Sequence, residues 1–314
     1  MRFSLQNRGL LAAACGLLAA ALCWPLLAQL PDNLISIQVK RVILYATVRE
    51  TKGGFVGDLQ KDDFEVLEDG VRQDIVSFSR EDLPVATAIL VDNSQSMLNK
   101  SREVVAAAKA FVRSSNPRDE IFVLHFNENL TYGLPENIPF TADHALLFDA
   151  LDRIRQDGQT ALYDAILEGL SHLQKSTLTK KALFVISDGG DNRSRHKDVD
   201  VIREADLSGA LFYAIGIYDP MDGDANPGVL RKLAQNTGGE AYFPKDVADV
   251  SKLCETIARD LRSQYMISYA PPETTAAGRD YRRVQVRVKG PKGRKLVVRT
   301  RTGYYASAKE GQKP

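Results

Sequence analysis

Residues 83–100, LPVATAILVDNSQSMLNK, decide the fold of this chain. The apolar run at residues 85–91 is short, rich in β-branched residues and bounded by polar ones, which is typical of a strand buried on both faces. A helical pattern follows, and its apolar face collects Val104, Ala108, Phe111 and Val112. Asp92, Ser94 and Ser96 therefore lie in the loop that leaves the carboxyl end of a central strand, where open α/β sheets bind ligands.

This loop offers three oxygen-bearing side chains in alternation. In an extended turn Asp92, Ser94 and Ser96 can point the same way. Because they offer oxygen and neither nitrogen nor sulfur, they suit Mg²⁺, Mn²⁺ or Ca²⁺ better than Zn²⁺ or Cu²⁺. The alternative is that Asp92 or one of the serines only caps the following helix.

Two further loops favour the metal site. Residues 158–166, GQTALYDAI, open a helix, and residues 182–191, ALFVISDGGD, read as a second buried strand that ends in acid and glycine. Together, Asp-x-Ser-x-Ser, a Thr after Gly-x and Asp-Gly at a strand end resemble the metal-ion-dependent adhesion site of von Willebrand factor type A domains. The resemblance covers roughly residues 85–262, with the three motifs in the family's order.

The resemblance implies a divalent-cation site made by Asp92, Ser94, Ser96, Thr160 and Asp188. Mg²⁺ is the favoured ion, with Mn²⁺ or Ca²⁺ as alternatives. The family often has Gly between the two serines, whereas this chain has Gln95, whose side chain could crowd the rim or contact a partner. Asp191, three residues past Asp188, either adds charge to the site or is a solvated loop acid.

The residue types indicate how such a site would act. If the directly bound groups are neutral hydroxyls, Asp92 and Asp188 act partly through water and the ion keeps much of its charge. Mg²⁺ prefers six oxygen ligands and keeps some waters, so one position stays open. In the resembled family, a carboxylate of a partner protein fills that position. We therefore predict a metal-dependent protein-interaction or adhesion module. The alternatives are a structural envelope scaffold whose ion only stabilises the fold, or a metal-dependent hydrolase.

The sequence argues against an enzyme. Hydrolysis at a bound ion needs a nearby general base. His125, His144 and His172 fall within a predicted strand or helices, so His196, in the polar loop at residues 192–198, is the candidate base. Neither a Gly-x-Ser-x-Gly elbow nor a Gly-x-x-x-x-Gly-Lys phosphate loop is present.

The beginning of the chain predicts export. Residues 1–28 carry Arg2, Arg8 and no acid, and residues 9–28 are uncharged, which is typical of a signal peptide cleaved after Ala28. The uncharged stretch is also near the ~20 residues that span a bilayer, so membrane attachment through residues 9–28 is the alternative. Either way the body of the protein lies in the periplasm, in the cell envelope or outside the cell.

Net charge and cysteine content bear on two further questions, the class of partner and the presence of disulfides. The chain has 41 basic and 40 acidic residues, and without residues 1–28 it has 39 and 40, a net charge of −1, which gives no reason to propose nucleic acid as a partner. Beyond the export segment only Cys254 remains, so no internal disulfide can form. Cys254 shares a helical face with apolar residues, and we predict a small core residue there.

The segments that flank the central region read as β structure. Residues 64–68 and 71–78 form a hairpin signal around Asp69-Gly70, and residues 264–270, 283–289 and 296–301 read as strands. Neither segment is long enough to close a core alone, so we expect one sandwich built from both. The Asp-Phe-x-Val-x-Glu-Asp-Gly motif at residues 63–70 and the final Gly303-Tyr304-Tyr305 resemble a bacterial envelope family of von Willebrand type A-related proteins.

The predicted fold class is α/β. Between the flanks, strands alternate with helices, which indicates a doubly wound, mainly parallel, Rossmann-like sheet. We divide the chain into an export segment (1–28), an N-terminal β segment (29–84), a von Willebrand type A domain (85–262), a C-terminal β segment (263–306) and a disordered tail (307–314). Residues 219–228 are expected to form an acidic rim loop near the ion.

Overall fold

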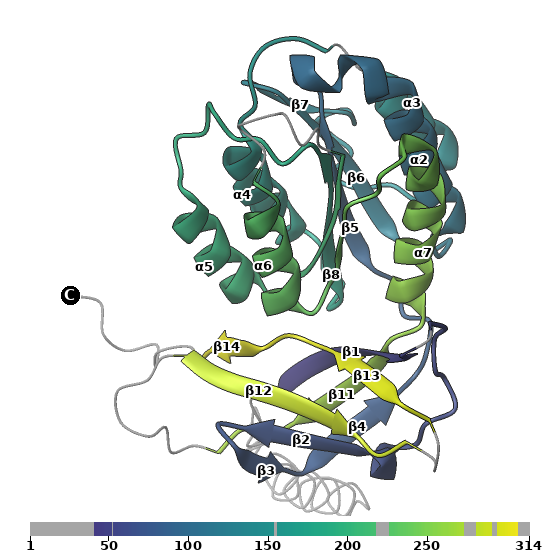
Figure 1. Ribbon diagram of the computed structural model, residues 1–314, viewed down its shortest axis with the longest axis vertical. Helices are drawn as coiled ribbons and strands as arrows, with labels where there is room; N and C mark the ends of the chain where they lie inside the picture. The colour runs from purple at the N-terminus through teal and green to yellow at the C-terminus, as the bar shows by residue number, and fades with distance from the viewer. Residues whose placement is uncertain are drawn as a thin grey trace, which may run out of the picture. The chain divides into compact units, whose positions relative to one another are not determined.

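The α/β part of the fold contains a six-stranded sheet ordered β10-β9-β8-β5-β6-β7. Figure 1 labels four of its strands, β5, β6, β7 and β8. Neighbouring strands run parallel except β6 and β7, which are antiparallel. The computed structural model describes residues 41–51, 53–153, 156–217, 226–272, 281–290 and 294–306. The strands are β5 (Ala86–Asp92), β6 (Glu120–Phe126), β7 (Leu130–Tyr132), β8 (Lys181–Ser187), β9 (Leu211–Gly216) and β10 (Ala241–Tyr242).

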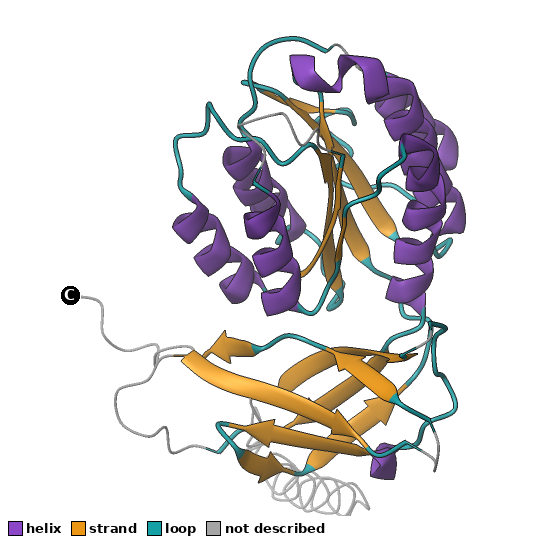
Figure 2. Cartoon of the chain, in the orientation of Figure 1, coloured by secondary structure: helices purple, strands orange, loops and turns teal. Residues whose placement is uncertain are grey.

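Helices cover both faces of this sheet (Figure 2). On one face α2 packs against α3 and α7, and on the other α4 packs against α5, which packs against α6. The helices are α2 (Ser101–Ser114), α3 (His144–Asp152), α4 (Leu162–Leu173), α5 (Asp198–Ser208), α6 (Pro227–Thr237) and α7 (Val250–Arg262). Because β5 and β8 are buried on both faces, their near-continuous apolar runs fit the predicted doubly wound sheet.

The flanking segments form two antiparallel four-stranded sheets, ordered β13-β1-β11-β4 and β14-β12-β2-β3. Each sheet combines strands that precede the central sheet with strands that follow it, and both contribute to one apolar core. This confirms the predicted fold class. The strands are β1 (Val42–Glu50), β2 (Phe64–Glu68), β3 (Val71–Gln73), β4 (Ile75–Ser79), β11 (Tyr265–Tyr269), β12 (Tyr281–Val288), β13 (Leu296–Arg299) and β14 (Gly303–Tyr305).

The Asp-Gly hairpin forms, but its second strand is shorter than expected. Asp69 and Gly70 have φ values of 48° and 85°, as a type I′ turn requires. Of the predicted second strand, β3 pairs with β2, whereas β4 pairs with β11 in the other sheet. The predicted strand at residues 71–78 is therefore divided at Asp74, where the chain passes from one sheet to the other.

A buried polar cluster joins the motif at residues 63–70 to the Gly303-Tyr304-Tyr305 motif. The Glu68 carboxylate, from the first motif, accepts the Tyr304 hydroxyl from the second at 2.9 Å. It also accepts the Tyr269 hydroxyl at 2.6 Å and pairs with the Arg282 guanidinium at 2.6 Å. Because burying an unpaired carboxylate is costly, these three donors explain how Glu68 can lie inside the sandwich.

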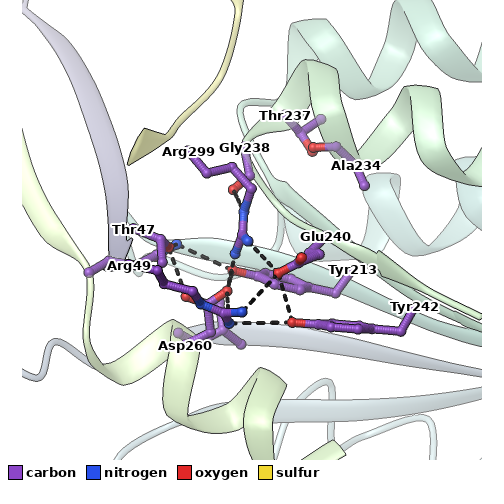
Figure 3. A network of polar contacts seen from close by, with 12 residues as sticks. Thr47, Arg49, Tyr213, Ala234, Thr237, Gly238, Glu240, Tyr242, Asp260 and Arg299 are labelled. Atoms are coloured by element: carbon purple, nitrogen blue, oxygen red, sulfur yellow. Dashed lines mark hydrogen bonds and ion pairs between the residues drawn. The ribbon is translucent and has the colours of Figure 1, made fainter. Parts of the chain in front are cut away.

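A second polar network ties the sandwich to the α/β part of the fold (Figure 3). Its centre is Asp260 of α7, which is fully buried. Oδ1 of Asp260 accepts the Thr47 hydroxyl of β1 at 2.7 Å. Oδ2 accepts the Tyr213 hydroxyl of β9 at 2.9 Å and the Arg299 guanidinium of β13. One carboxylate thus connects two sandwich strands to α7 and to the central sheet.

The structure describes Cys254 but not the two predicted terminal segments. Cys254 is free and buried in α7, and burial raises the pKa of its thiol, as expected for a core residue. The predicted export segment at residues 1–28 and the tail at residues 307–314 lie outside the described residues. Within the described ranges, no helix is both long enough and apolar enough to cross a membrane.

Candidate metal site

The predicted metal ligands lie at the switch point of the central sheet. Asp92 is the last residue of β5, and Asp188 follows the last residue of the neighbouring strand β8. The chain leaves β5 through α2 toward β6 on one side, and leaves β8 through α5 toward β9 on the other. Loops that diverge in this way leave a crevice at the carboxyl edge of the sheet, where doubly wound folds bind ligands.

Asp92 is buried and firmly held. It is 2% exposed, its Oδ1 accepts the Ser94 backbone N–H at 2.9 Å, and its Oδ2 accepts the Ser187 hydroxyl at 2.5 Å. Burial, with the nearby Asp188 charge, raises the pKa of Asp92 to about 7. A carboxylate whose charge is disfavoured in this way gains from a nearby cation.

Three of the predicted ligands form a hydrogen-bonded chain. The hydroxyl oxygens of Ser94 and Ser96 lie 3.0 Å apart, and the Ser96 hydroxyl donates to Oδ2 of Asp188. The other oxygen of Asp188 accepts the Gly190 N–H at 3.1 Å. Ser94 and Asp188 are buried whereas Ser96, which contacts both, is exposed, so the chain of oxygens reaches the surface at its middle member.

Thr160 lies in the adjoining loop and is held through its backbone. That loop is joined to the Asp92 loop by two hydrogen bonds, Asp157 N–H to Asn93 O at 3.0 Å and Gln95 N–H to Gly158 O at 3.2 Å. The Thr160 N–H donates to Oδ1 of Asn192 at 3.0 Å. The structure thus joins Ser94, Ser96 and Asp188 through side-chain contacts and joins Asp92 to the Ser94 backbone, with Thr160 in the adjoining loop.

Sequence reasoning missed two residues that organise this region. Ser187 holds Asp92, and Asn192 holds Thr160. Ser187 carried a weak signal, since it is the one polar residue at the end of an apolar run. Asn192 carried none, because an Asn in a polar loop looks like any turn residue.

Asp191 has a role that neither alternative described. Its Oδ2 accepts the Tyr163 N–H at 2.8 Å and the Ser194 hydroxyl at 2.6 Å, and its side chain is partly shielded from solvent. The expectation of a solvated loop acid is therefore wrong. Asp191 satisfies a free N–H in the first turn of α4, as a capping residue would, from a distant part of the chain.

The histidines are engaged elsewhere. His196 pairs through Nδ1 with Oδ1 of Asp164 at 2.7 Å. Nε2 of His125 lies 2.8 Å from Ala150 O, and burial lowers the pKa of this imidazole. His172 packs 4.0 Å from the Phe122 ring centroid. Each described contact therefore gives these side chains a structural role.

The donor set fits a hard divalent cation. The predicted set consists of two carboxylates and three hydroxyls. It is therefore not a cluster of three or more His, Cys, Asp or Glu side chains, and the described residues contain no such cluster that could hold a metal. Ser94, Ser96 and Asp188 already lie in one chain of oxygen contacts, and their hydroxyl and carboxylate lone pairs are of the kind that hard divalent cations take as ligands.

The rim of the site is partly described. Gln95, the departure from the family pattern, is exposed beside Ser96. Residues 219–225 of the expected acidic rim loop lie outside the described residues. The end of that loop is described, and the Asn226 N–H donates to Gly189 O at 3.0 Å, next to Asp188.

Comparison with known proteins identifies the family. The model of the von Willebrand factor type A domain matches residues 88–256. A comparison with curated proteins found no match. Among solved structures, a von Willebrand factor type A protein from Catenulispora acidiphila is 16% identical, with a TM-score of 0.52, over 79% of this chain and 75% of that one. This likeness concerns the fold alone.

Two other solved structures each cover 56% of this chain. BatB from Bacteroides thetaiotaomicron is 17% identical over 56% of this chain and 98% of that chain, with a TM-score of 0.47. The von Willebrand factor domain of the type V pili tip protein Mfa5 from Porphyromonas gingivalis is 14% identical over 56% and 94%, with a TM-score of 0.46.

Proposed function

Because the chain belongs to the von Willebrand factor type A domain family, we propose that it is an exported protein-interaction module that binds an acidic group of a partner through a divalent cation. Mg²⁺ is the favoured ion, and Mn²⁺ or Ca²⁺ are alternatives. The observation that carries the proposal is the contact chain Ser94–Ser96–Asp188 beside buried Asp92 at the switch point of the sheet.

Each predicted ligand has a distinct task in this proposal. Ser94, Ser96 and Thr160 would hold the ion through neutral oxygens, while Asp92 and Asp188 balance its charge. When bound, the cation supplies a positive centre that accepts a carboxylate oxygen of the partner. Ser187 donates to Asp92 and would keep it oriented, and the exposure of Ser96 supports a site that is open toward solvent.

The test measures binding of the purified protein to a blocked peptide that contains one Asp between glycines. With Mg²⁺ present we expect saturable binding, and with EDTA none. Ser94→Ala should weaken binding at least about tenfold, or roughly 1.4 kcal/mol, because it removes a predicted ligand. Ser171→Ala, a matched change at an exposed position of α4, should have no effect.

A structural scaffold is the alternative outcome of the same test. In that case Mg²⁺ raises the melting temperature, because any ligand selective for the folded state stabilises it, but no acidic peptide binds. Binding that is equal in Mg²⁺ and EDTA would also overturn the proposal.

We further propose that the protein is not an enzyme. What supports this is the engagement of the candidate bases. His196, the only one predicted near the site, is paired with Asp164 at the start of α4, and His125 and His172 contact backbone carbonyls. A general base must instead reach the proton it abstracts.

Export and the domain boundaries remain part of the proposal. We propose a segment at residues 1–28 that directs export, followed by a β segment at 29–84, the von Willebrand type A domain at 85–262, a β segment at 263–306 and a tail. Residues 9–28 would attach the protein to the membrane if the segment is not cleaved.

Tryptophan fluorescence separates cleavage from attachment. Trp24 is the only tryptophan in the chain and lies within the proposed export segment. Protein purified from the producing cell should show no tryptophan emission, because Trp24 has been removed. A tryptophan signal from membrane-derived protein would instead indicate an uncleaved anchor.

A further inference from the structure

A basic loop adjoins the proposed metal site. Residues 192–197, NRSRHK, carry Arg193, Arg195, His196 and Lys197. The backbone N–H groups of Asn192 and Arg193 both donate to Thr160 O at 3.0 Å. The basic loop is therefore joined by hydrogen bonds to the peptide group of a predicted metal ligand.

The basic loop is held in place by acids that point inward. Asp164 accepts the backbone N–H groups of Arg195 and His196 as well as the His196 ring. Asp191 accepts the Ser194 hydroxyl, and the Ser194 hydroxyl in turn accepts the Asp164 N–H at 3.0 Å. These contacts fix the loop to the start of α4, so its shape is set before any partner arrives.

The same contacts leave the arginine charges available. The Asp164 side chain is only 20% exposed and is occupied by loop donors. Arg193 and Arg195 are exposed, and among the described residues neither guanidinium has an ion pair. Asp164 therefore accepts hydrogen bonds from the backbone of the loop, while the permanently charged side chains of Arg193 and Arg195 are exposed to solvent.

We propose that the basic loop binds acidic residues that flank the carboxylate taken by the ion, so the partner segment carries several acids in succession. This inference rests on the proposed function, because the ion anchors the central carboxylate. Exposed charges at the rim of an interface mainly steer association and set its dependence on salt. The added binding should therefore weaken as ionic strength rises, since the screening length is about 8 Å at physiological salt.

The experiment measures the affinities of the purified protein, in the presence of Mg²⁺, for three blocked peptides. The first has one Asp between glycines, the second has Glu on both sides of that Asp, and the third has the same three acids separated by long glycine spacers. We expect the second peptide to bind about tenfold more tightly than the first at low salt, and the third to bind like the first. The difference should shrink below threefold at high salt, by screening.

Paired variants test the residues. Arg193→Gln with Arg195→Gln should remove the preference for the second peptide and leave the affinities for Mg²⁺ and for the one-acid peptide unchanged. The control pair is Arg259→Gln with Lys289→Gln, which removes the same charge from exposed positions in α7 and after β12. That pair should keep the preference. Neither change should affect the fold, because the basic loop is held by backbone, Ser194 and His196 atoms among the described residues.

The outcomes are distinguishable. If the one-acid peptide binds in Mg²⁺ but the flanking acids add nothing, the proposed function stands and this inference fails. If the control pair loses the preference as well, net charge rather than the basic loop is responsible, and the inference also fails. If no peptide binds in Mg²⁺, both proposals fall.

Discussion

Asp92→Asn is expected to abolish the binding of Mg²⁺ while the protein stays folded. Asn retains an oxygen that can accept the Ser94 N–H, and its amide can donate to the Ser187 hydroxyl, so the local hydrogen bonds survive. What is lost is the charge that balances the cation. In the metal-free state the variant should be at least as stable as the wild type, because Asp92 and Asp188 no longer repel each other.

Calorimetric titration measures the Mg²⁺ affinity of the variant, and thermal unfolding measures its stability with and without Mg²⁺. At free Mg²⁺ of about 100 times the dissociation constant, linkage stabilises the wild type by about 2.7 kcal/mol, and the variant should show none of this gain. Asp149→Asn, a matched change at an exposed position of α3, should keep both binding and stabilisation. If Asp92→Asn retained the wild-type affinity for Mg²⁺, binding of the ion would not depend on this carboxylate.

Asp260→Ala is expected to have the largest effect on stability of any change considered for this protein. The variant leaves the Arg299 guanidinium, the Tyr213 hydroxyl and the Thr47 hydroxyl without their shared acceptor in a buried setting. Arg299, whose side chain is 21% exposed, keeps among the described acidic residues only its pair with the partly exposed Glu240, while the two hydroxyls stay buried. Removing one partner of a buried ion pair typically costs about 3–5 kcal/mol. We expect a loss in the free energy of unfolding within that range.

Urea unfolding is the measurement, and Glu240→Ala is the control. Glu240 also pairs with Arg299 and Arg49, but its side chain is 32% exposed, so solvent can replace it. Its removal should cost about 1 kcal/mol or less. Equal losses for the two variants would show that Asp260 is not the centre of the network. A loss below about 1 kcal/mol for Asp260→Ala would show that the network contributes little.

Local pattern was enough to predict the central strands and the helices of the α/β part, but not the division of residues 71–78 into two strands. The apolar run before Asp92 and the run before Asp188 each carry a signal within a few residues, and the fold places both at neighbouring positions of one sheet. The oxygen-rich loops follow from the same positions, because the carboxyl ends of parallel strands meet at one edge.

Long-range polar partners could not be predicted in this way. Ser187 and Asp92 are 95 residues apart, and Thr47 and Asp260 are 213 apart. Nothing local marks an Asp in a helix as the acceptor for a distant arginine, since the same residue on an exposed face would look identical in sequence. Asp191 was misjudged for this reason, because its donor, Tyr163, belongs to an earlier part of the chain.

The pairing of β1 with β11 and β13 has a consequence for biosynthesis. Leu44 of β1 lies opposite Ile267, and Val48 lies opposite Val298, so this strand finds its neighbours only when nearly the whole polypeptide has left the ribosome. Until then its edges are bare and prone to wrong association. A nascent chain that stops before residue 265 would have its α/β part complete but would carry an unfinished sandwich, so the sandwich can close only after residues 265–305 have been made.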